Sequence, residues 1–337
     1  MIHLHCFTYG RGRPLELEQF CRSIHYYERD RSNWQLFSSL PNIVRSRRSA
    51  DLINRLQADT HPILFEGIHT TFPLHAQKWP GRKIVIRLHN KENEYYAQQS
   101  RQTRSILQKL YYRTESMKLQ SYEKTLIPNY PVACISVQET RHCREVLGAQ
   151  KVFELPPFVG WEIPLCLEGT GSFCLFHGNL SVAENDRSAR WLLEKVFAKM
   201  DVPLVIAGKN PSPKLIKLAH RWQHTCIVSN PTAAEMQDLI RKAQIHVLPS
   251  FTTTGIKFKL LNAVFCGRHV VANQAMVKDS RLESACHLTE NAAGFQSVIM
   301  QLFRRSFSEE EVELRSGLLQ NYYDNEGHAR QLINWLY

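Results

Sequence analysis

The sequence predicts an α/β protein made of two similar domains, each with a parallel β-sheet covered by helices on both faces. Short apolar runs typical of buried strands alternate with helix-compatible segments, and this alternation favours parallel sheets. The alternation restarts once, after residues 160–171, which contain Gly and Pro and have no apolar periodicity. The length of 337 residues suits two domains of ordinary size.

The N-terminal half provides the first set of elements. Residues 2–8 are predicted to form a short strand, and residues 16–24 a helix, because Leu17, Phe20 and Ile24 recur at helical spacing. Residues 93–126 form a long charged run compatible with one helix, which Pro128 ends. Further strands are expected at 63–67, 83–89, 132–137 and 152–159, with another helix at 138–147.

The C-terminal half repeats the pattern. Strands are expected at 173–178, 203–208, 226–230, 245–250 and 269–273, and helices at 188–200, 213–222, 233–243 and 256–267. The predicted domains are residues 1–160 and 161–315. A C-terminal helical segment, 316–337, is expected to cross back to the first domain.

Composition excludes several classes of protein. Hydrophobic residues make up 43% of the chain, but no stretch approaches the ~20 apolar residues that span a bilayer. The N-terminus does not resemble a signal peptide, so a cytoplasmic protein is expected. The nine cysteines contain no CxxC pair, which indicates free thiols. His177 and His287 lie close in sequence to Cys174 and Cys286, but at spacings that match no usual metal site, so no metal is expected.

The formal charge of +11 is compatible with simple solubility or with an anionic partner. Such a partner could be a nucleotide phosphate, an anionic lipid surface or nucleic acid. Zinc-finger, KH and RRM signatures are missing from the sequence, so nucleic-acid binding is not expected. Peripheral contact with an anionic membrane remains a hypothesis.

In parallel α/β sheets, ligands bind beyond the carboxyl ends of the strands. In the second half, Gly178 and Asn179 follow one predicted strand, and Lys209 follows the next. Glycine allows a ligand to approach the backbone closely, and a lysine there can contact a phosphate. Plain turns with an exposed lysine remain the alternative for both sites.

The most informative segment follows the strand that ends at Pro249. A helix beginning just past Ser250 would direct free N–H groups at an anion. Thr253 or Thr254 would cap this helix or contact the anion, with Gly255 beside them. Lys257 would lie in the first turn, where a positive charge is unfavourable unless an anion binds nearby. An ordinary capped helix with surface lysines is the alternative.

The first half offers fewer candidates. His89 follows a predicted strand, with Glu92 nearby to accept a hydrogen bond, and these two residues are the predicted catalytic pair. Gly67 ends another strand. Gly10 and Gly12 form a glycine-rich loop that is expected on the acceptor side. A dinucleotide fingerprint fails there because Leu15 stands where the third glycine is required, and no phosphate-binding P-loop motif occurs.

The run from residue 245 to 273 resembles the donor-site signature of family-four GT-B glycosyltransferases. Gly267 and residues 270–272 match its "G-x-P-V-V-A" portion, with His269 in place of Pro, and residues 254–259 look like a variant "T-G-x-K-x-K" loop. Four further segments are similar to parts of the same enzymes, namely 87–96, 176–181, 204–211 and 229–250.

This resemblance implies two Rossmann-like domains that face each other across a cleft and hold a nucleotide sugar. It implies transfer with retention of configuration and without a bound metal or other cofactor, to a glycan, lipid-linked or other cell-envelope acceptor. His89 would be a catalytic or sugar-contacting residue. Lys209 and residues 255–257 would hold the diphosphate, and the segment with Asn230 and Met236 would lie beside the base.

One departure from the family concerns two glutamates that commonly lie eight residues apart. Here Thr254 and Asn262 occupy these positions, where the family contacts the sugar and the ribose. Both can form hydrogen bonds, but neither carries a negative charge. A catalytically weak nucleotide-sugar-binding or scaffold protein is therefore the alternative function.

Overall fold

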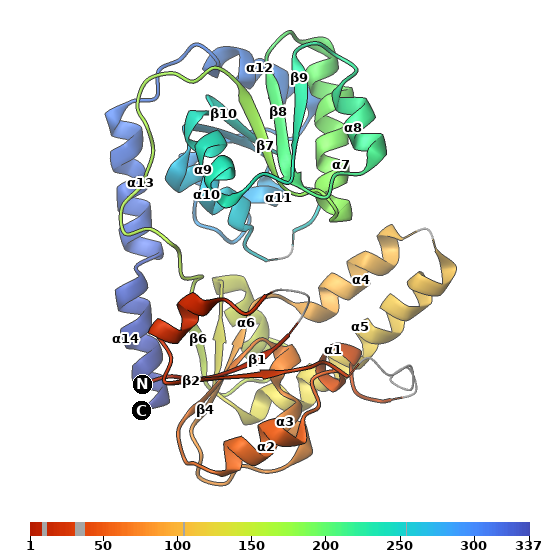
Figure 1. Cartoon of the computed structure of the whole chain (residues 1–337), viewed down its shortest axis with the longest axis vertical. Helices are drawn as coiled ribbons and strands as arrows, with labels where there is room; N and C mark the ends of the chain where they lie inside the picture. Colours follow the sequence, from red (N-terminus) through yellow and green to blue (C-terminus); the bar gives the residue numbers. More distant parts are fainter. Residues whose placement is uncertain (9–11, 31–37, 104, 254) are drawn as a thin grey trace. The chain divides into compact units, whose positions relative to one another are not determined.

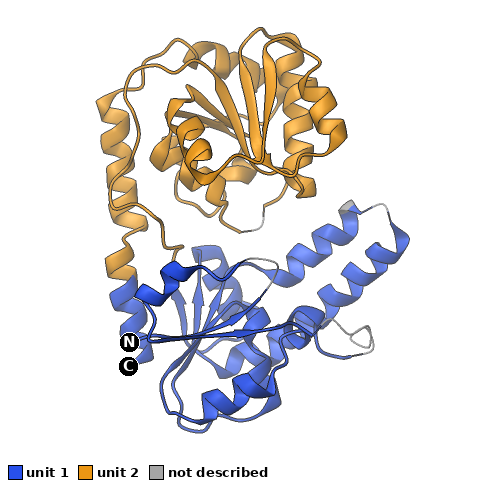
Figure 2. Ribbon diagram, viewed as in Figure 1, with its two compact units in different colours: residues 1–155, 329–337 blue, residues 156–328 orange. Residues whose placement is uncertain are grey.

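The computed structural model describes residues 1–8, 12–30, 38–103, 105–253 and 255–337. The chain forms two compact units (Figure 2). Unit 1 contains residues 1–155 and 329–337, and unit 2 contains residues 156–328. Each unit holds a parallel sheet with helices around it, which confirms the predicted α/β class with two Rossmann-like domains.

A four-stranded parallel sheet forms the centre of unit 1, in the order β3-β4-β5-β6 (Figure 1). The apolar runs predicted as strands form β3 (Ile63–Glu66), β4 (Ile84–Leu88), β5 (Val132–Cys134) and β6 (Val152–Glu154). Every residue of β4 is buried, as expected for a strand with neighbours on both edges and helices on both faces. Helices α1 (Asn42–Arg45), α2 (Ala50–Gln57), α3 (Phe72–Ala76) and α6 (Val137–Glu145) also belong to unit 1.

The N-terminal segment differs from the prediction. The expected helix at 16–24 is wrong, because the chain forms a short 3-10 helix (Leu15–Gln19) and then strand β2 (Ser23–Tyr27). Strand β2 pairs in parallel with β1 (His3–Phe7) in a separate two-stranded sheet. Of the three residues whose spacing suggested a helix, Phe20 is 71% exposed and Leu17 and Ile24 are only half-buried, so this spacing buries little surface.

The long charged run is two helices, α4 (Glu92–Gln102) and α5 (Ile106–Leu126), which pack side by side. Thr103 ends α4 in an extended conformation, and the Ser105 hydroxyl caps α5 by accepting from the Gln108 amide. A 3-10 turn that contains Pro128 follows α5, where the sequence predicts the end of the helix. Within the part of the chain that the structure describes, no helix has both the length and the apolarity needed to cross a membrane.

Unit 2 contains a six-stranded parallel sheet in the order β12-β11-β10-β7-β8-β9. Its strands are β7 (Cys174–Asn179), β8 (Leu204–Lys209), β9 (Thr225–Ser229), β10 (Ile245–Leu248), β11 (His269–Ala272) and β12 (His287–Leu288). The strand order reverses direction between the adjacent strands β7 and β10. In sheets of this topology, the crevice at the carboxyl ends of these two strands binds the ligand.

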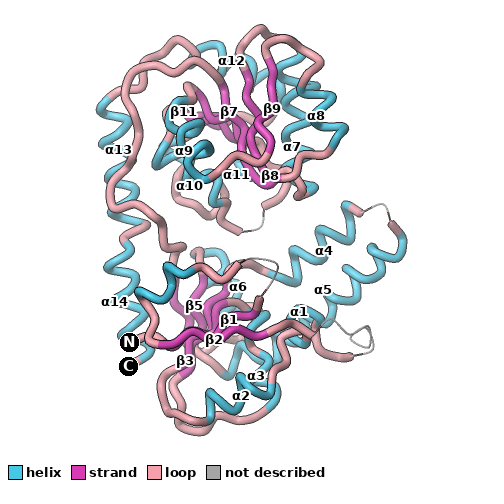
Figure 3. Tube along the Cα trace, in the orientation of Figure 1, coloured by secondary structure: helices cyan, strands magenta, loops and turns pink. Residues whose placement is uncertain are grey.

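Helices cover both faces of the unit 2 sheet. Figure 3 shows α7 and α8 on one face and α9 and α10 on the other. The helices of unit 2 are α7 (Ala183–Trp191), α8 (Pro213–Ala219), α9 (Ala233–Lys242), α10 (Phe258–Cys266), α11 (Gln274–Val277), α12 (Ala292–Leu302) and α13 (Glu309–Tyr322), and α14 (Asn325–Leu336) follows them. Fully buried Phe176, Phe197, Phe265 and Phe295 belong to one core between these layers.

Helix α14 contributes to both units, since its residues 325–328 belong to unit 2 and its residues 329–336 to unit 1. Within unit 1, the ring of Trp335 stacks on Phe153 of strand β6, with centroids 3.7 Å apart and planes inclined by 13°. The last residues of the chain are thus part of the packing of unit 1.

Candidate functional site

The carboxyl ends of β7 and β8 approach each other closely. A Cβ atom at Gly208 would overlap the carbonyl oxygen of Gly178, so only glycine fits there. Gly178 has a positive φ of 156°, and a Cβ atom there would meet the side-chain amide of Asn185 at 3.1 Å. The same Asn185 Nδ2 donates to the carbonyl oxygen of Asn179 at 2.9 Å. The predicted residues Gly178 and Asn179 are therefore the closely packed last two residues of β7, just before α7.

Glu184, in the first turn of α7, connects this turn to the loop after β10. Its Oε1 accepts hydrogen bonds from the Ser250 hydroxyl at 3.1 Å and from the Phe251 amide at 2.7 Å. Asn273 also fixes Ser250, because its side chain accepts from the Ser250 amide and donates to the Ser250 carbonyl. The Oε2 atom of Glu184 is buried and forms no hydrogen bond with any described residue. The Glu184 carboxylate thus joins the start of α7 to the loop after β10. Glu184 was not among the predicted site residues.

Two lysines lie close to Glu184. The Lys259 ammonium donates to Asn185 Oδ1 at 2.7 Å and lies 5.0 Å from the centre of the Phe176 ring. The Lys257 ammonium donates to the carbonyl oxygen of Gly255 at 3.3 Å. Burial lowers the pKa of each lysine to about 8, although the Glu184 carboxylate acts in the opposite direction on both. Two partly desolvated cations therefore accompany one half-buried carboxylate at the switch point.

Helix α10 begins later than predicted. It starts at Phe258, Lys257 is its N-cap, and no side chain caps it. The prediction of a helix start just past Ser250, with Lys257 in the first turn and Thr253 as a cap, is therefore wrong. The Ser250 hydroxyl, which donates to Glu184, instead accepts from the Thr252 amide at 3.3 Å, and this local turn competes with helix.

Three other predicted donor residues belong to this loop or to α10: Gly255, Thr254 and Asn262. Gly255 has φ of 68°, which explains a glycine there. Thr254 lies outside the described residues. Asn262, on the second turn of α10, donates from Nδ2 to the Phe258 carbonyl at 2.9 Å, a bond within its own helix.

The other predicted donor residues lie along the same sheet edge, at the ends of β8 and β9. Asn230 has φ of 55°, and its Oδ1 accepts from the Asn210 amide at 2.8 Å, which links the two strand ends. Lys209 is the exposed last residue of β8. Met236, on α9, is half-buried against the small apolar cluster that contains Leu175 and Ala207.

In unit 1, His89 contacts a carboxylate, but the partner is not the expected one. Its Nε2 atom lies 2.7 Å from Glu66 Oε2, and Arg87 Nη1 lies 3.4 Å from Glu66 Oε1. Burial raises the pKa of Glu66, but the hydrogen bond from His89 and the charge of Arg87 outweigh it, so this pKa is lowered overall. Because β3 and β4 are neighbours and Glu66 pairs in register with Arg87, tertiary pairing brings Glu66 to His89.

Glu92 is the first residue of α4, and burial raises its pKa, with His89 opposing the shift. Its carboxylate therefore lies within electrostatic range of His89, while the hydrogen bond goes to Glu66. Gly67, the predicted acceptor-side glycine of this region, has φ of 89°, and a Cβ atom there would collide with the ring of His69.

The glycine-rich loop is described only in part. Gly12 has no atom within 4 Å of the position a Cβ would take, so no close packing requires a glycine there. Gly10 lies outside the described residues.

Most of unit 2 matches a known protein family. Residues 171–304 match the family described as glycosyl transferases group 1. This match includes the predicted donor residues of the second half and the six strands of its sheet.

A curated relative from Klebsiella pneumoniae is described as an uncharacterized 44.6 kDa protein in the cps region. The two sequences are 24% identical over 265 residues, which cover 74% of this chain and 67% of the relative.

Solved structures share the fold at low sequence identity. Staphylococcus aureus TarM matches with a TM-score of 0.66 at 12% identity over 88% of this chain. The chain spans only 58% of the length of TarM. WaaG, a glycosyltransferase involved in lipopolysaccharide biosynthesis, matches with a TM-score of 0.60 at 12% identity over 96% of this chain and 87% of its own. Anabaena HepE in complex with UDP gives the same score and identity over 100% of this chain and 99% of its own.

Proposed function

We propose that this chain, whose residues 171–304 match the group 1 glycosyltransferases and whose fold is GT-B, transfers a sugar from a UDP-sugar to a glycan or lipid-linked saccharide of the cell envelope. UDP in the complexes of HepE and TarM supports the donor. The relative from the cps region and the role of WaaG in lipopolysaccharide biosynthesis support the acceptor class.

The observation that carries this proposal is the pair of lysines beside Glu184 at the switch point of the unit 2 sheet. We propose that Lys257 and Lys259 bind the diphosphate of the donor, together with Lys209 at the end of β8. The diphosphate gains negative charge as the sugar leaves, and fixed ammonium groups in a partly desolvated site stabilise this charge without reorganisation. Retention of configuration, and transfer without a catalytic metal, are parts of the same proposal.

Glu184 and His89 have separate proposed roles. Glu184 holds the Ser250 loop through Oε1, and its charge acts on Lys257 and Lys259. It thus provides a carboxylate in a site where Thr254 and Asn262 replace the acidic residues of the family. In unit 1, His89 is proposed as the residue that contacts the transferred sugar, with Glu66 orienting its ring.

Thermal denaturation in the presence of UDP and a panel of UDP-sugars tests the donor site. We expect a rise in melting temperature for the wild type and a reduced rise for Lys257→Met, because one charge-assisted hydrogen bond contributes about 1.5–3 kcal/mol, or roughly 10- to 100-fold in affinity. Lys214→Met is a matched control, since Lys214 is an exposed lysine in the first turn of α8. No shift with any nucleotide sugar would contradict the proposal.

A second measurement separates a transferase from a protein that only binds. Release of UDP in the presence of saccharide acceptors, followed by NMR assignment of the anomeric configuration, should give a retained product in the presence of EDTA. A thermal shift without UDP release would instead favour the catalytically weak binding protein.

The membrane contact is proposed for the N-terminal end of α5. Ile106, Leu107 and Leu110 are 83%, 82% and 60% exposed there. The exposed basic residues Lys109 and Arg113 lie on the same stretch. Apolar side chains interspersed with cations are typical of helices that lie on anionic lipid surfaces.

A further inference from the structure

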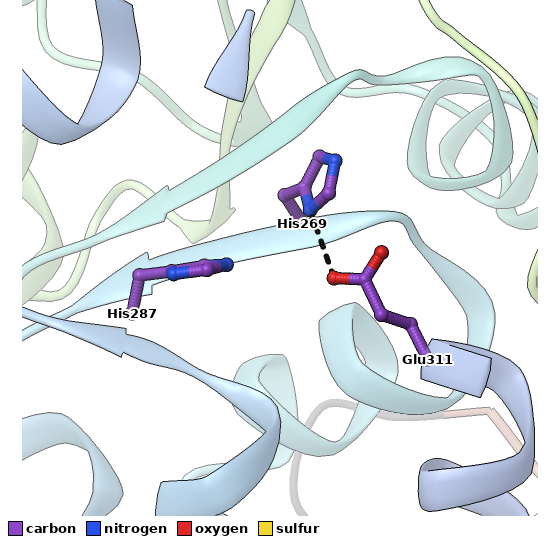
Figure 4. Close-up of side chains that lie close together, drawn as sticks. All are labelled: His269, His287 and Glu311. Carbon is purple, nitrogen blue, oxygen red and sulfur yellow. Dashed lines mark ion pairs between the residues drawn. The ribbon is translucent and has the colours of Figure 1, made fainter. Parts of the chain in front are cut away.

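A cluster of two histidines and a glutamate lies in unit 2 at the sheet edge opposite the donor site. His269 and His287 are the first residues of β11 and β12, and Glu311 lies in the first turn of α13. One ligand atom of each residue lies within 4.8 Å of the other two. Figure 4 shows the three side chains converging from these elements. None of them belongs to the proposed transfer chemistry.

The buried His269 has an unprotonated ring nitrogen that can bind a metal ion. Its side chain is fully buried, and Nε2 lies 3.1 Å from the carbonyl oxygen of Arg305. Because a carbonyl only accepts, Nε2 carries the proton, and in the neutral ring Nδ1 is then the unprotonated nitrogen. Nδ1 is buried and has no hydrogen-bond partner among the described residues. A backbone carbonyl that fixes the tautomer in this way is a common partner of metal-binding histidines.

Glu311 is oriented in a similar way. Its Oε2 accepts from the Ser308 amide at 3.1 Å as part of the capping box of α13. Its Oε1 lies 3.4 Å from His269 Nδ1, which is too long for a good hydrogen bond. Two acceptor atoms at this separation fit a shared cation, because two ligands about 2.0–2.1 Å from a tetrahedral Zn²⁺ lie about 3.3 Å apart.

We propose that His269, His287 and Glu311 bind a divalent transition-metal ion of the zinc type. Two imidazoles and one carboxylate suit Zn²⁺ and leave one tetrahedral position for water, whereas Mg²⁺ prefers oxygen ligands. The charges of two arginines, Arg305 and Arg315, act on His269 and His287. The Arg315 guanidinium donates to the carbonyl oxygens of Val264, Gly267 and Arg268.

The ion has a structural role. It joins strands β11 and β12 to the first turn of α13, at the amino ends of the strands and away from the switch point. His287 lies next to Cys286 in the sequence, but the proposed ligands come together only through the pairing of β11 with β12 and the return of α13.

Binding of metal to the full chain, first freed of metal with a chelator, tests the proposal. Isothermal titration with Zn²⁺ should give one equivalent per chain, and Co²⁺ should give the visible absorption bands of a four- or five-coordinate ion. At a hundredfold excess over Kd, Zn²⁺ should raise the melting temperature by roughly 5–10 °C, while Mg²⁺ should have no effect. These readouts need no transferase activity, so they are independent of the proposed donor and acceptor.

His287 and Glu311 are more exposed than His269, so replacing them disturbs the packing less. His287→Gln and Glu311→Gln should each lose the tight equivalent and the Zn²⁺-dependent thermal shift, with unchanged circular dichroism. His224→Gln is the matched control, because His224 Nδ1 also lies 3.4 Å from a carboxylate, that of Asp201, and its Nε2 also contacts a backbone carbonyl. His224 belongs to no three-ligand group among the described residues. Failure of the wild type to bind, or retention of the equivalent by both ligand variants, would overturn the proposal.

Discussion

Glu184 is the residue on which the geometry of the proposed donor site most depends. It binds the Ser250 hydroxyl and the Phe251 amide on the far side of the switch point, and its charge acts on both lysines. The two effects can be separated, because an amide keeps the hydrogen-bond acceptor and removes the charge.

We expect Glu184→Ala to lower the free energy of unfolding by about 1–3 kcal/mol, because it leaves the Phe251 amide without its acceptor. Glu184→Gln should lower the free energy of unfolding by a smaller amount. Urea denaturation of both variants measures this, with Glu194→Ala, an exposed glutamate that follows α7, as a control expected within about 0.5 kcal/mol of the wild type. An Ala variant as stable as the control would show that Glu184 does not hold the loop.

The lowered pKa values of Lys257 and Lys259 predict that raising the pH has opposite effects on the free energy of unfolding and on nucleotide affinity. Their folded pKa of about 8 lies below the ~10.4 of an unfolded lysine. Between about pH 8 and 10 the unfolded chain therefore binds more protons, and the contribution of these groups to stability rises with pH. Below pH 8, the cost of burying their charge is fully present.

Nucleotide affinity should change in the other direction, because the diphosphate binds the protonated lysines. We expect the affinity for UDP to fall above pH 8, by up to about tenfold per pH unit for each lysine. Calorimetric titration from pH 7 to 9.5 measures it, and Lys257→Met should show a shallower decline. The diphosphate itself is almost fully ionised above pH 8, so an affinity independent of pH between 8 and 9.5 would contradict direct contact with the ammonium groups.

At the scale of the elements, the sequence predicted what depends on local apolar patterning. The buried strands β4, β7 and β10 are short apolar runs, and all three lie where expected. Strand β2 was missed because Leu17, Phe20 and Ile24 happen to have helical spacing, whereas pairing with β1 determines the structure. The start of α10 was misplaced because side-chain bonds of Ser250 extend the preceding loop.

The same distinction applies to the candidate sites. Glycines at strand ends and lysines in the loops that follow strands can be recognised from position alone, so Gly178 and Lys257 could be named as candidates. The partners Glu66 and Glu184 could not, because each reaches its site through contacts between segments far apart in sequence. His269 was noticed only as a replacement for proline, since Glu311 and His287 meet it through the packing of α13 and the pairing of β11 with β12.

The end of α5 gives a prediction for this element. The double variant Ile106→Ser/Leu107→Ser should bind vesicles containing anionic lipid at least about tenfold more weakly, because it removes two exposed apolar side chains from the contact. Co-sedimentation measures this, and Met300→Ser, which changes a 61%-exposed residue on α12, is the control. Equal binding of the double variant and the control would exclude α5 as the contact.

At the scale of the whole molecule, unit 1 is discontinuous in sequence, because residues 329–337 pack with residues 1–155. Trp335→Ala should destabilise unit 1 by about 2–3 kcal/mol through loss of the stack on Phe153. Ile333→Ala, on the exposed side of the same helix, should have little effect. Limited proteolysis with mass mapping should show faster cleavage within 1–155 for the Trp335 variant only, and equal cleavage of both variants would contradict the role of the stack.

This discontinuity also affects how the protein is made. On the ribosome, strands β3 to β6 emerge early, but the partner of Phe153 is translated only after the whole of unit 2. A nascent chain therefore carries an incomplete first unit for most of its synthesis, with the apolar surface around Phe153 open to chaperones.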